Sequence, residues 1–329
     1  NVPIGLISSS WGGTPIHSWT PMRTLEKFPD VIAYRDLKIK QAKKITVEKL
    51  EKENQIIIEK WKEAKERSKI TGEKVRQWPR LKRHPVQSQD FHANLYNGMI
   101  HPLIPYTLRG TIWYQGEANA GSHKEAKLYR KMLENLTQSW REDWNDTFSF
   151  YAVQLVNFMA PVKSPIQDSG WAHIRQSFLD YHKDVEKAGI AVGIDVGDAS
   201  DIHPKDKQTI GYRLAQQALV HDYKFDRVPG GPIYQTMRVK DDQAILYFSD
   251  TGSGLVSKDG EVLNWFAIAG EDRIFKKADA KIMDNVVVVS HPEINEPKAI
   301  RYAWANNPEG CNLYNKEGFP ASPFRTDNW

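Results

Sequence analysis

The sequence predicts an α/β fold built on a parallel sheet, with a small all-β module at its C-terminal end. Between residues 110 and 223, short β-branched or aromatic runs alternate with amphipathic helical segments. Polar loops follow the predicted strands, where ligands bind in sheets of this kind. Beyond residue 225 the pattern changes to short strands separated by turn residues. The alternation of strands and helices indicates a sheet with helices on both faces.

The first part of the chain combines an apolar run with a charged helical segment. Residues 1–7 are interpreted as a buried strand without a lead-in, and residues 8–13 as a small-residue turn at the active-site edge. A domain rarely begins inside a core strand, so we expect that upstream sequence is missing. Residues 25–83 are rich in Lys and Glu, with apolar residues at helical spacing. They predict a long helix or helical hairpin inserted into the fold.

The remaining elements follow from periodicity and turn signals. The predicted strands of the sheet are residues 110–114, 148–155 and 190–196, and the predicted helices are residues 123–144, 171–185 and 207–223. A Pro-Gly-Gly-Pro break at residues 229–232 precedes the predicted strands 244–248, 265–269, 285–290 and 299–303. Two domains are therefore expected, residues 1–225 and residues 226–329.

Composition excludes several classes of partner. The chain has 329 residues and a net charge of +4, with opposite charges interleaved in the charged helical segment. This is typical of a solvated helix face, so no nucleic-acid partner is expected. No run of 18 apolar residues is present, so no membrane insertion is expected. The single cysteine, Cys311, excludes an intrachain disulfide and a cysteine-based zinc cage.

Asp201 and His203 lie in a loop between a predicted strand and the next helix. A histidine beside a carboxylate that fixes its tautomer can act as a general base toward a serine. In the alternative, Asp201 caps the following helix and His203 is an ordinary loop residue. A second alternative is a divalent cation held by His203 with Asp195, Asp198 and Asp201.

Other segments offer hydrogen-bond donors or sugar contacts. A predicted strand is followed by Gln115, Glu117 and Asn119. Amide side chains at this position can stabilise an oxyanion. The alternative is a plain strand-to-helix turn, with Asn119 or Ser122 capping the helix. Gly12 and Gly13 offer backbone amides, and Ser10 matches half of a nucleophile elbow. Arg175 suggests a carboxylate clamp beside a tryptophan sugar platform, although most of the 11 tryptophans are expected in the core.

These blocks, taken in order, resemble the sialate O-acetylesterases. The first contains Trp11-Gly12-Gly13, a later one contains Gln115-Gly116-Glu117, and the last contains Asp201-Ile202-His203. In full, the similar blocks are residues 4–14, 95–103, 112–119 and 201–215, with a further match at 318–327. The resemblance covers nearly the whole chain except the helical insert, and four ordered blocks are far more specific than any one of them.

The resemblance implies an SGNH-hydrolase fold, a flavodoxin-like three-layer α/β sandwich, in the first domain. It implies hydrolysis of acetyl esters on sugars, notably O-acetylated sialic acid, with no metal or organic cofactor. His203 would be the general base and Asp201 its orienting acid. Gln115 with the amide of Gly12 or Gly13 would line the oxyanion hole. The remaining residues expected to line the site are Glu117, Asn119, Asn97 and Arg175.

One departure from the family pattern concerns the nucleophile. The family's serine lies in a Gly-Gln-Ser-Asn block upstream of the Trp-Gly-Gly block, and this sequence contains no such block. We therefore expect the serine to come from a longer chain or from a separate N-terminal fragment of the same protein. The alternatives are a non-catalytic relative that binds acetylated glycans and an acetylesterase acting on another polysaccharide such as xylan. The family also implies a bacterial protein exported to the periplasm or secreted.

Overall fold

A computed structural model describes residues 4–329. The described residues form two compact units, residues 4–104 and residues 105–329. The predicted domain boundary at residues 225 and 226 lies inside the second unit. Over the described range, no helix is both long and apolar enough to span a membrane.

The second unit is built on a parallel sheet, as the sequence predicts. Its strands are β1 (Gly110–Trp113), β2 (Ser149–Gln154) and β3 (Ala188–Val192), in the order β1-β2-β3. All side chains of β2 are buried because neighbouring strands pair with it on both sides and helices cover it. β3 ends earlier than predicted, since residues 193–196 form a turn.

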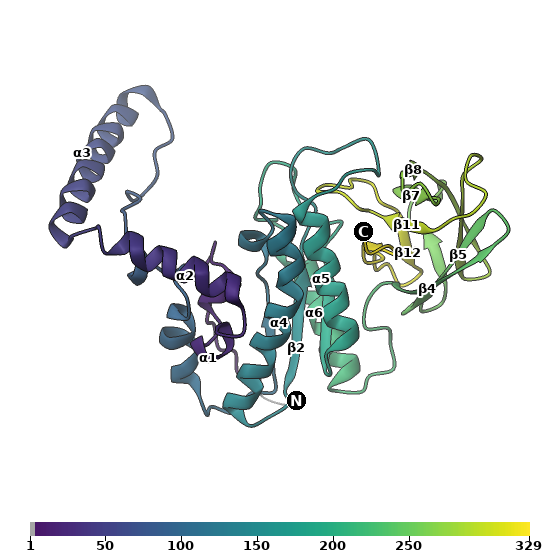
Figure 1. Cartoon of the computed structure of the whole chain (residues 1–329), viewed down its shortest axis with the longest axis horizontal. Helices are drawn as coiled ribbons and strands as arrows, with labels where there is room; N and C mark the ends of the chain where they lie inside the picture. The colour runs from purple at the N-terminus through teal and green to yellow at the C-terminus, as the bar shows by residue number, and fades with distance from the viewer. Residues whose placement is uncertain (1–3) are drawn as a thin grey trace. The chain divides into compact units, whose positions relative to one another are not determined.

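Three helices cover the sheet, each capped by a side chain that accepts a backbone N–H. They are α4 (His123–Trp144), α5 (Gly170–Asp184) and α6 (Lys207–His221), capped by Ser122, Ser169 and Asp206. The cap of α6 is therefore Asp206, whereas the sequence suggested Asp201 for this role. Figure 1 shows α4 and α5 running side by side, and the Ser177 hydroxyl on α5 donates to the Ala126 carbonyl on α4 at 2.6 Å.

The helices make two layers with the sheet between them. On one face, Tyr151 and Val153 of β2 pack with Ile210 and Leu214 of α6. On the other face, Phe150 packs against the rings of Trp140 on α4 and Tyr181 on α5. Side chains alternate between the two faces of a strand, so β2 supplies both cores. This arrangement confirms the predicted α/β fold with helices on both faces of a parallel sheet.

The C-terminal part is antiparallel, as predicted. Its strands are β4 (Ile233–Lys240), β5 (Gln243–Ser249), β6 (Leu255–Ser257), β7 (Phe266–Ala269), β8 (Lys276–Lys277), β9 (Asp279–Met283), β10 (Val286–Ser290), β11 (Ala299–Tyr302), β12 (Leu313–Asn315) and β13 (Phe324–Arg325). They form sheets in the orders β4-β5-β10-β9, β13-β11-β7-β8 and β12-β6. Asp284 and Asn285, with φ of 45° and 66°, make the turn between β9 and β10.

Buried polar contacts join these strands to the α/β layers, which explains why residues 105–329 are one unit. The Gln154 amide, at the end of β2, donates to the Ser322 hydroxyl at 2.9 Å. Tyr314 on β12 donates through its hydroxyl to Asp195 at 3.0 Å. The C-terminal strands are therefore fixed beside the carboxyl edge of the parallel sheet.

The first unit is mainly helical. It contains η1 (Ile16–Ser18), α1 (Met22–Leu25), α2 (Pro29–Ala42), α3 (Val47–Thr71), η2 (Pro85–Gln87), η3 (Tyr96–Ile100) and η4 (His101–Leu103). The predicted long helix is α3, which has no buried residue and is capped by Thr46 and by Gly72 at φ 73°. The return segment lies along it, since Lys82 and Asn54 exchange hydrogen bonds (Figure 1). This segment is not a helix, so α3 does not form a hairpin with it.

The predicted N-terminal buried strand is wrong for residues 4–7, while residues 1–3 lie outside the described residues. Leu6 is 92% exposed and Ile4 is 72% exposed, and neither is in a strand. An apolar run has the same sequence pattern whether or not another strand pairs with it. Residues 8–13 likewise lie in coil and a turn, so the predicted strand-to-turn arrangement is not formed here.

Candidate functional site

The carboxyl edge of the parallel sheet gathers polar segments that are far apart in the sequence. Residues 115–119 follow β1, Asn157 follows β2, and the loop of residues 193–206 follows β3. Asn157 accepts the Gly197 N–H at 2.8 Å, and Phe158 forms a β-bridge with Asp198. Ligands of parallel sheets bind at this edge, so it is the candidate functional site.

Gln115 is held in one orientation by two neighbours. Its amide nitrogen donates to Asn119 Oδ1 at 2.9 Å, and its Oε1 accepts the Tyr129 hydroxyl at 2.8 Å. The same hydroxyl accepts the Trp113 indole N–H at 3.1 Å. Gln115, Asn119 and Tyr129 are all buried. A fixed amide of this kind is suited to stabilising developing negative charge because it needs no reorganisation.

Gly116 explains why this block contains a glycine. Its φ is 153°, in a region that side-chain-bearing residues avoid. A Cβ there would also lie 3.3 Å from side-chain atoms of both Leu155 and Phe178. Glycine therefore lets the chain turn sharply from β1 into the short helix η5 (Glu117–Asn119).

Glu117 shares this edge with two basic side chains. Burial raises the pKa of Glu117, and the charges of His203 and Lys207 partly oppose that shift. Lys207 Nζ lies 4.9 Å from the centre of the Tyr114 ring. Burial also raises the pKa of Tyr114, whose hydroxyl has no hydrogen-bond partner within residues 4–329. The structure thus brings Glu117 into the electrostatic range of His203.

His203 and Asp201 are adjacent and largely open to solvent. The His203 Nδ1 and Asp201 Oδ1 atoms are 3.5 Å apart, and the two side chains are 79% and 45% exposed. The separation is too long for a hydrogen bond between the side chains. Asp201 Oδ1 instead accepts the backbone N–H of His203 at 2.9 Å. The loop places the His203 imidazole at the sheet edge but does not form a hydrogen bond between the two side chains.

The carboxylates suggested for a cation with His203 have other partners. Burial alone would raise the pKa of Asp195, but the hydrogen bonds and charge of Arg213 outweigh it and lower that pKa. Arg213 donates to both Asp195 oxygens, at 2.6 and 2.9 Å. Asp198 Oδ1 accepts the backbone N–H and the hydroxyl of Ser200. These contacts give Asp195 and Asp198 local structural roles.

Three expected site residues belong to the first unit. Gly12 and Gly13 lie in an exposed turn, in which Thr14 Oγ1 donates to the Trp11 carbonyl at 2.8 Å. Asn97 is exposed on η3, and its backbone N–H donates to Ala93 at 2.8 Å. Their roles toward a ligand stay predictions.

Arg175 differs from the predicted carboxylate clamp. The residue is fully buried on α5, and its guanidinium donates to backbone carbonyls alone among the contacts described. The acceptors are Leu155, Val156, Ala305 and Asn306, at 2.6 to 2.9 Å. Burial lowers its pKa to about 9. The sequence pattern could not distinguish this internal role from a ligand contact.

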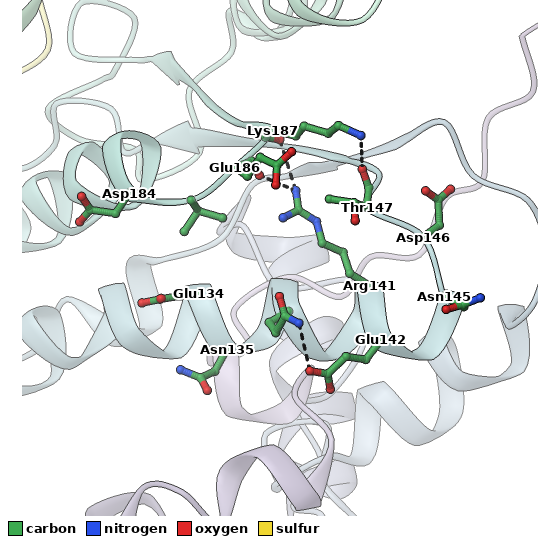
Figure 2. A pocket seen from close by; sticks show the side chains of 12 residues that line it. Glu134, Asn135, Arg141, Glu142, Asn145, Asp146, Thr147, Asp184, Glu186 and Lys187 are labelled. Atoms are coloured by element: carbon green, nitrogen blue, oxygen red, sulfur yellow. Dashed lines mark hydrogen bonds between the residues drawn. The ribbon is translucent and has the colours of Figure 1, made fainter.

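A cavity of about 890 Å³ lies at the opposite, amino edge of the sheet. Figure 2 shows Arg141 at its centre, donating to the Glu186 carbonyl that precedes β3. Its lining residues are Glu134, Asn135, Gln138, Arg141, Glu142, Asn145, Asp146, Thr147, Asp184, Val185, Glu186 and Lys187. Arg141 is occupied by carbonyls, and none of the predicted site residues lines this cavity. The carboxyl edge of the sheet is therefore the better candidate for the functional site.

Sequence reasoning missed three contributors to the carboxyl edge. Tyr129 lies two turns into α4, and its role shows only in the contact with Gln115. Tyr114 and Lys207 flank Glu117. Lys207 could have been found from the sequence, because it lies in the block of residues 201–215 that also contains Asp201 and His203.

Comparisons with known proteins show which proteins this chain is similar to. A family model described as "Carbohydrate esterase, sialic acid-specific acetylesterase" matches residues 67–219. The chain is 29% identical to the mouse sialate O-acetylesterase and 26% identical to the human one, over 98% of its length. It spans 60% and 57% of those proteins. A solved carbohydrate acetylesterase from Xanthomonas citri superposes with a TM-score of 0.75 at 33% identity, over 100% of this chain and 62% of that one.

Proposed function

We propose that the chain is part of a sialate O-acetylesterase-like protein, and that the whole protein is a carboxylic ester hydrolase that removes O-acetyl groups from sugars. The observation that carries the proposal is the carboxyl edge, where a fixed Gln115 amide and the His203 imidazole lie on loops that follow β1 and β3. O-acetylated sialic acid is the substrate class we propose, and an exported location follows the family expectation.

The proposed chemistry is acyl transfer through an acetyl-enzyme. A serine in a Gly-Gln-Ser-Asn block, supplied by polypeptide outside these 329 residues, attacks the acetyl carbonyl. His203 takes the serine proton, and Asp201 turns to orient and stabilise the imidazolium. The imidazolium gives this proton to the sugar oxygen as the bond between that oxygen and the acetyl carbon breaks. Water, deprotonated by His203, then releases acetate from the serine. Gln115 donates a hydrogen bond to the oxyanion, with Glu117 and Asn119 beside it. The 3.5 Å gap between His203 and Asp201 then closes on substrate binding, as catalytic contacts often do.

The test is acetate release by the whole protein from O-acetylated sialic acid and, in parallel, from acetylated xylan. We expect turnover with a clear preference for the sialic acid ester. The 329-residue chain without the serine block is expected to leave p-nitrophenyl acetate intact. Equal turnover of xylan would reject the substrate class. Glycan binding without acetate release by the whole protein would reject the hydrolase proposal in favour of a binding relative.

Tyr129 is expected to be a positioning residue for Gln115. Tyr129→Phe removes the hydroxyl that fixes Gln115 Oε1, so we expect kcat to fall by up to about 100-fold through misorientation. Tyr181→Phe is the matched control, because Tyr181 is equally buried and its hydroxyl pairs with Thr137 at 2.8 Å. Each variant should lose about 1 kcal/mol of unfolding free energy. Equal kcat values for the two variants would contradict the assigned role, and an unchanged KM with a lowered kcat in Tyr129→Phe alone would support it.

A further inference from the structure

Two histidines and an aspartate from separate segments meet beside the first turns of α4 and α5. His123 is the first residue of α4, His173 lies in the first turn of α5, and Asp168 precedes the cap of α5. His173 Nε2 is 2.9 Å from Asp168 Oδ1, and His123 Nδ1 is 3.3 Å from Asp168 Oδ2. The three side chains offer ligand atoms that all lie within 4.8 Å of one another.

The fold holds this cluster together independently of its own hydrogen bonds. A Cβ on Gly170 would lie 2.2 Å from the Ala120 carbonyl, so only glycine lets the start of α5 pack against the turn before α4. About two helical turns beyond Gly170, the Ser177 hydroxyl donates to the Ala126 carbonyl and fixes the two helices to each other. His123 and His173 therefore face each other, with ring centres 4.7 Å apart.

The three groups combine one fixed ligand with two accessible ones. His173 is only 4% exposed and packs edge-on against Trp304 at 5.1 Å, which fixes the position of its ring. The His123 and Asp168 side chains are 46% and 54% exposed, which leaves the cluster open to an ion from solvent.

We propose that His123, Asp168 and His173 form a binding site for a divalent transition-metal ion, with Zn²⁺ the best fit. Ligand atoms in a tetrahedral zinc site lie about 3.3 Å apart, given metal–ligand bonds of about 2 Å. The distances of 2.9 and 3.3 Å from Asp168 to the two imidazoles are close to this spacing. Rotation of the exposed His123 ring would bring its nitrogen to the exact bonding distance. Two imidazoles and one carboxylate leave the fourth position for water.

The positive potential around the cluster limits which metal ions it would bind. The positive ends of two helices meet here, and Lys127 and Arg325 add positive charge near His173. Mg²⁺ and Ca²⁺ bind mainly oxygen ligands, and a single carboxylate offers them little against this potential. A late transition metal gains from strong bonds to the two imidazoles. The ion would join α4 to α5 four residues beyond Asn119, and so brace the loop that carries Gln115.

The test is Zn²⁺ titration of the EDTA-treated, dialysed 329-residue chain against a chromogenic chelator, with melting temperature as a second readout. We expect one Zn²⁺ per chain, a higher melting temperature with Zn²⁺, and no such rise with Mg²⁺. His123→Ala should weaken binding at least about 10-fold, the lower range for loss of a supporting group at a metal site. Asp168→Asn should weaken it while preserving the shape of the cluster.

Two variants keep the result decisive. His173→Ala risks the fold because the residue is buried, whereas His123→Ala changes an exposed side chain and tests the site without that risk. His203→Ala is the control for adventitious binding to an exposed histidine and should leave Zn²⁺ affinity unchanged. Absence of stoichiometric binding, or an affinity that His123→Ala leaves unaltered, would overturn the proposal. Zn²⁺ binding is measured without acetate release, so the two proposals can fail separately.

Discussion

His203→Ala in the whole protein lowers kcat/KM for acetyl ester hydrolysis by about 10²- to 10⁴-fold, the usual contribution of a general base. The imidazole lies in the loop after β3, 79% exposed, and shares the sheet edge with Glu117. Under the proposed mechanism His203 takes the serine proton, so its removal leaves the attack without its general base. Initial rates with O-acetylated sialic acid, measured on purified wild-type and variant protein, give the ratio.

A histidine away from the site provides the control. His291 lies in the loop that follows β10, and its Nδ1 accepts the Glu293 N–H. His291→Ala is expected to keep kcat/KM within about twofold of wild type, since surface changes rarely reach a site. The melting temperature of His203→Ala should match that of wild type, because the side chain packs against little. If His203→Ala retained full activity, the base would have to be another residue and the block alignment would fail.

Arg175→Met destabilises the protein by more than about 4 kcal/mol, which places it among the most damaging single substitutions. Methionine fills much of the same volume, and replacing a buried charge by an apolar group can be neutral when its partners are also removed. Here the partners are four backbone carbonyls, which no side-chain change removes. Each buried carbonyl left unpaired costs about 1–3 kcal/mol. Urea denaturation followed by circular dichroism measures the loss.

The control for Arg175 is an arginine with an exposed partner. Arg130 on α4 pairs with Asp184, and the two side chains are 34% and 51% exposed. Arg130→Met should cost no more than about 1 kcal/mol, as surface ion pairs contribute little. Arg175→Lys keeps the charge but cannot reach acceptors on both segments with one ammonium group, so an intermediate loss is expected. A loss below about 1 kcal/mol for Arg175→Met would show that the carbonyls find other donors.

The sequence predicted most elements because their signals are local. The helix over residues 123–144 was assigned from its apolar spacing and matches α4 at both ends. The turn at Asp284 and Asn285 follows from residues that tolerate positive φ. The strand over residues 190–196 was too long, since its apolar pattern continues into the turn at residues 193–196. Periodicity reports which side chains are apolar and not where backbone pairing ends.

For the candidate site, the order of motifs along the chain predicted which loops would meet, but it did not predict which side chains would touch. Gln115 and His203 were assigned from motifs that each follow a strand, and parallel strands bring such loops to one edge. The Tyr129 contact with Gln115 depends on how α4 packs on β1, which no motif records. The meeting of His123 with Asp168 and His173 likewise depends on the packing of α4 against α5.

By itself the sequence determined the α/β fold, the antiparallel C-terminal strands and the similarity to the sialate O-acetylesterases, because periodicity, turns and ordered motifs are properties of neighbouring residues. Only the tertiary structure decided that Arg175 binds backbone carbonyls and that residues 4–7 are exposed. Both depend on what lies opposite a side chain after the chain has folded. An arginine or an apolar run looks the same in sequence whether its partners are ligands, carbonyls, another strand or water. Partners from distant segments are therefore fixed by packing alone.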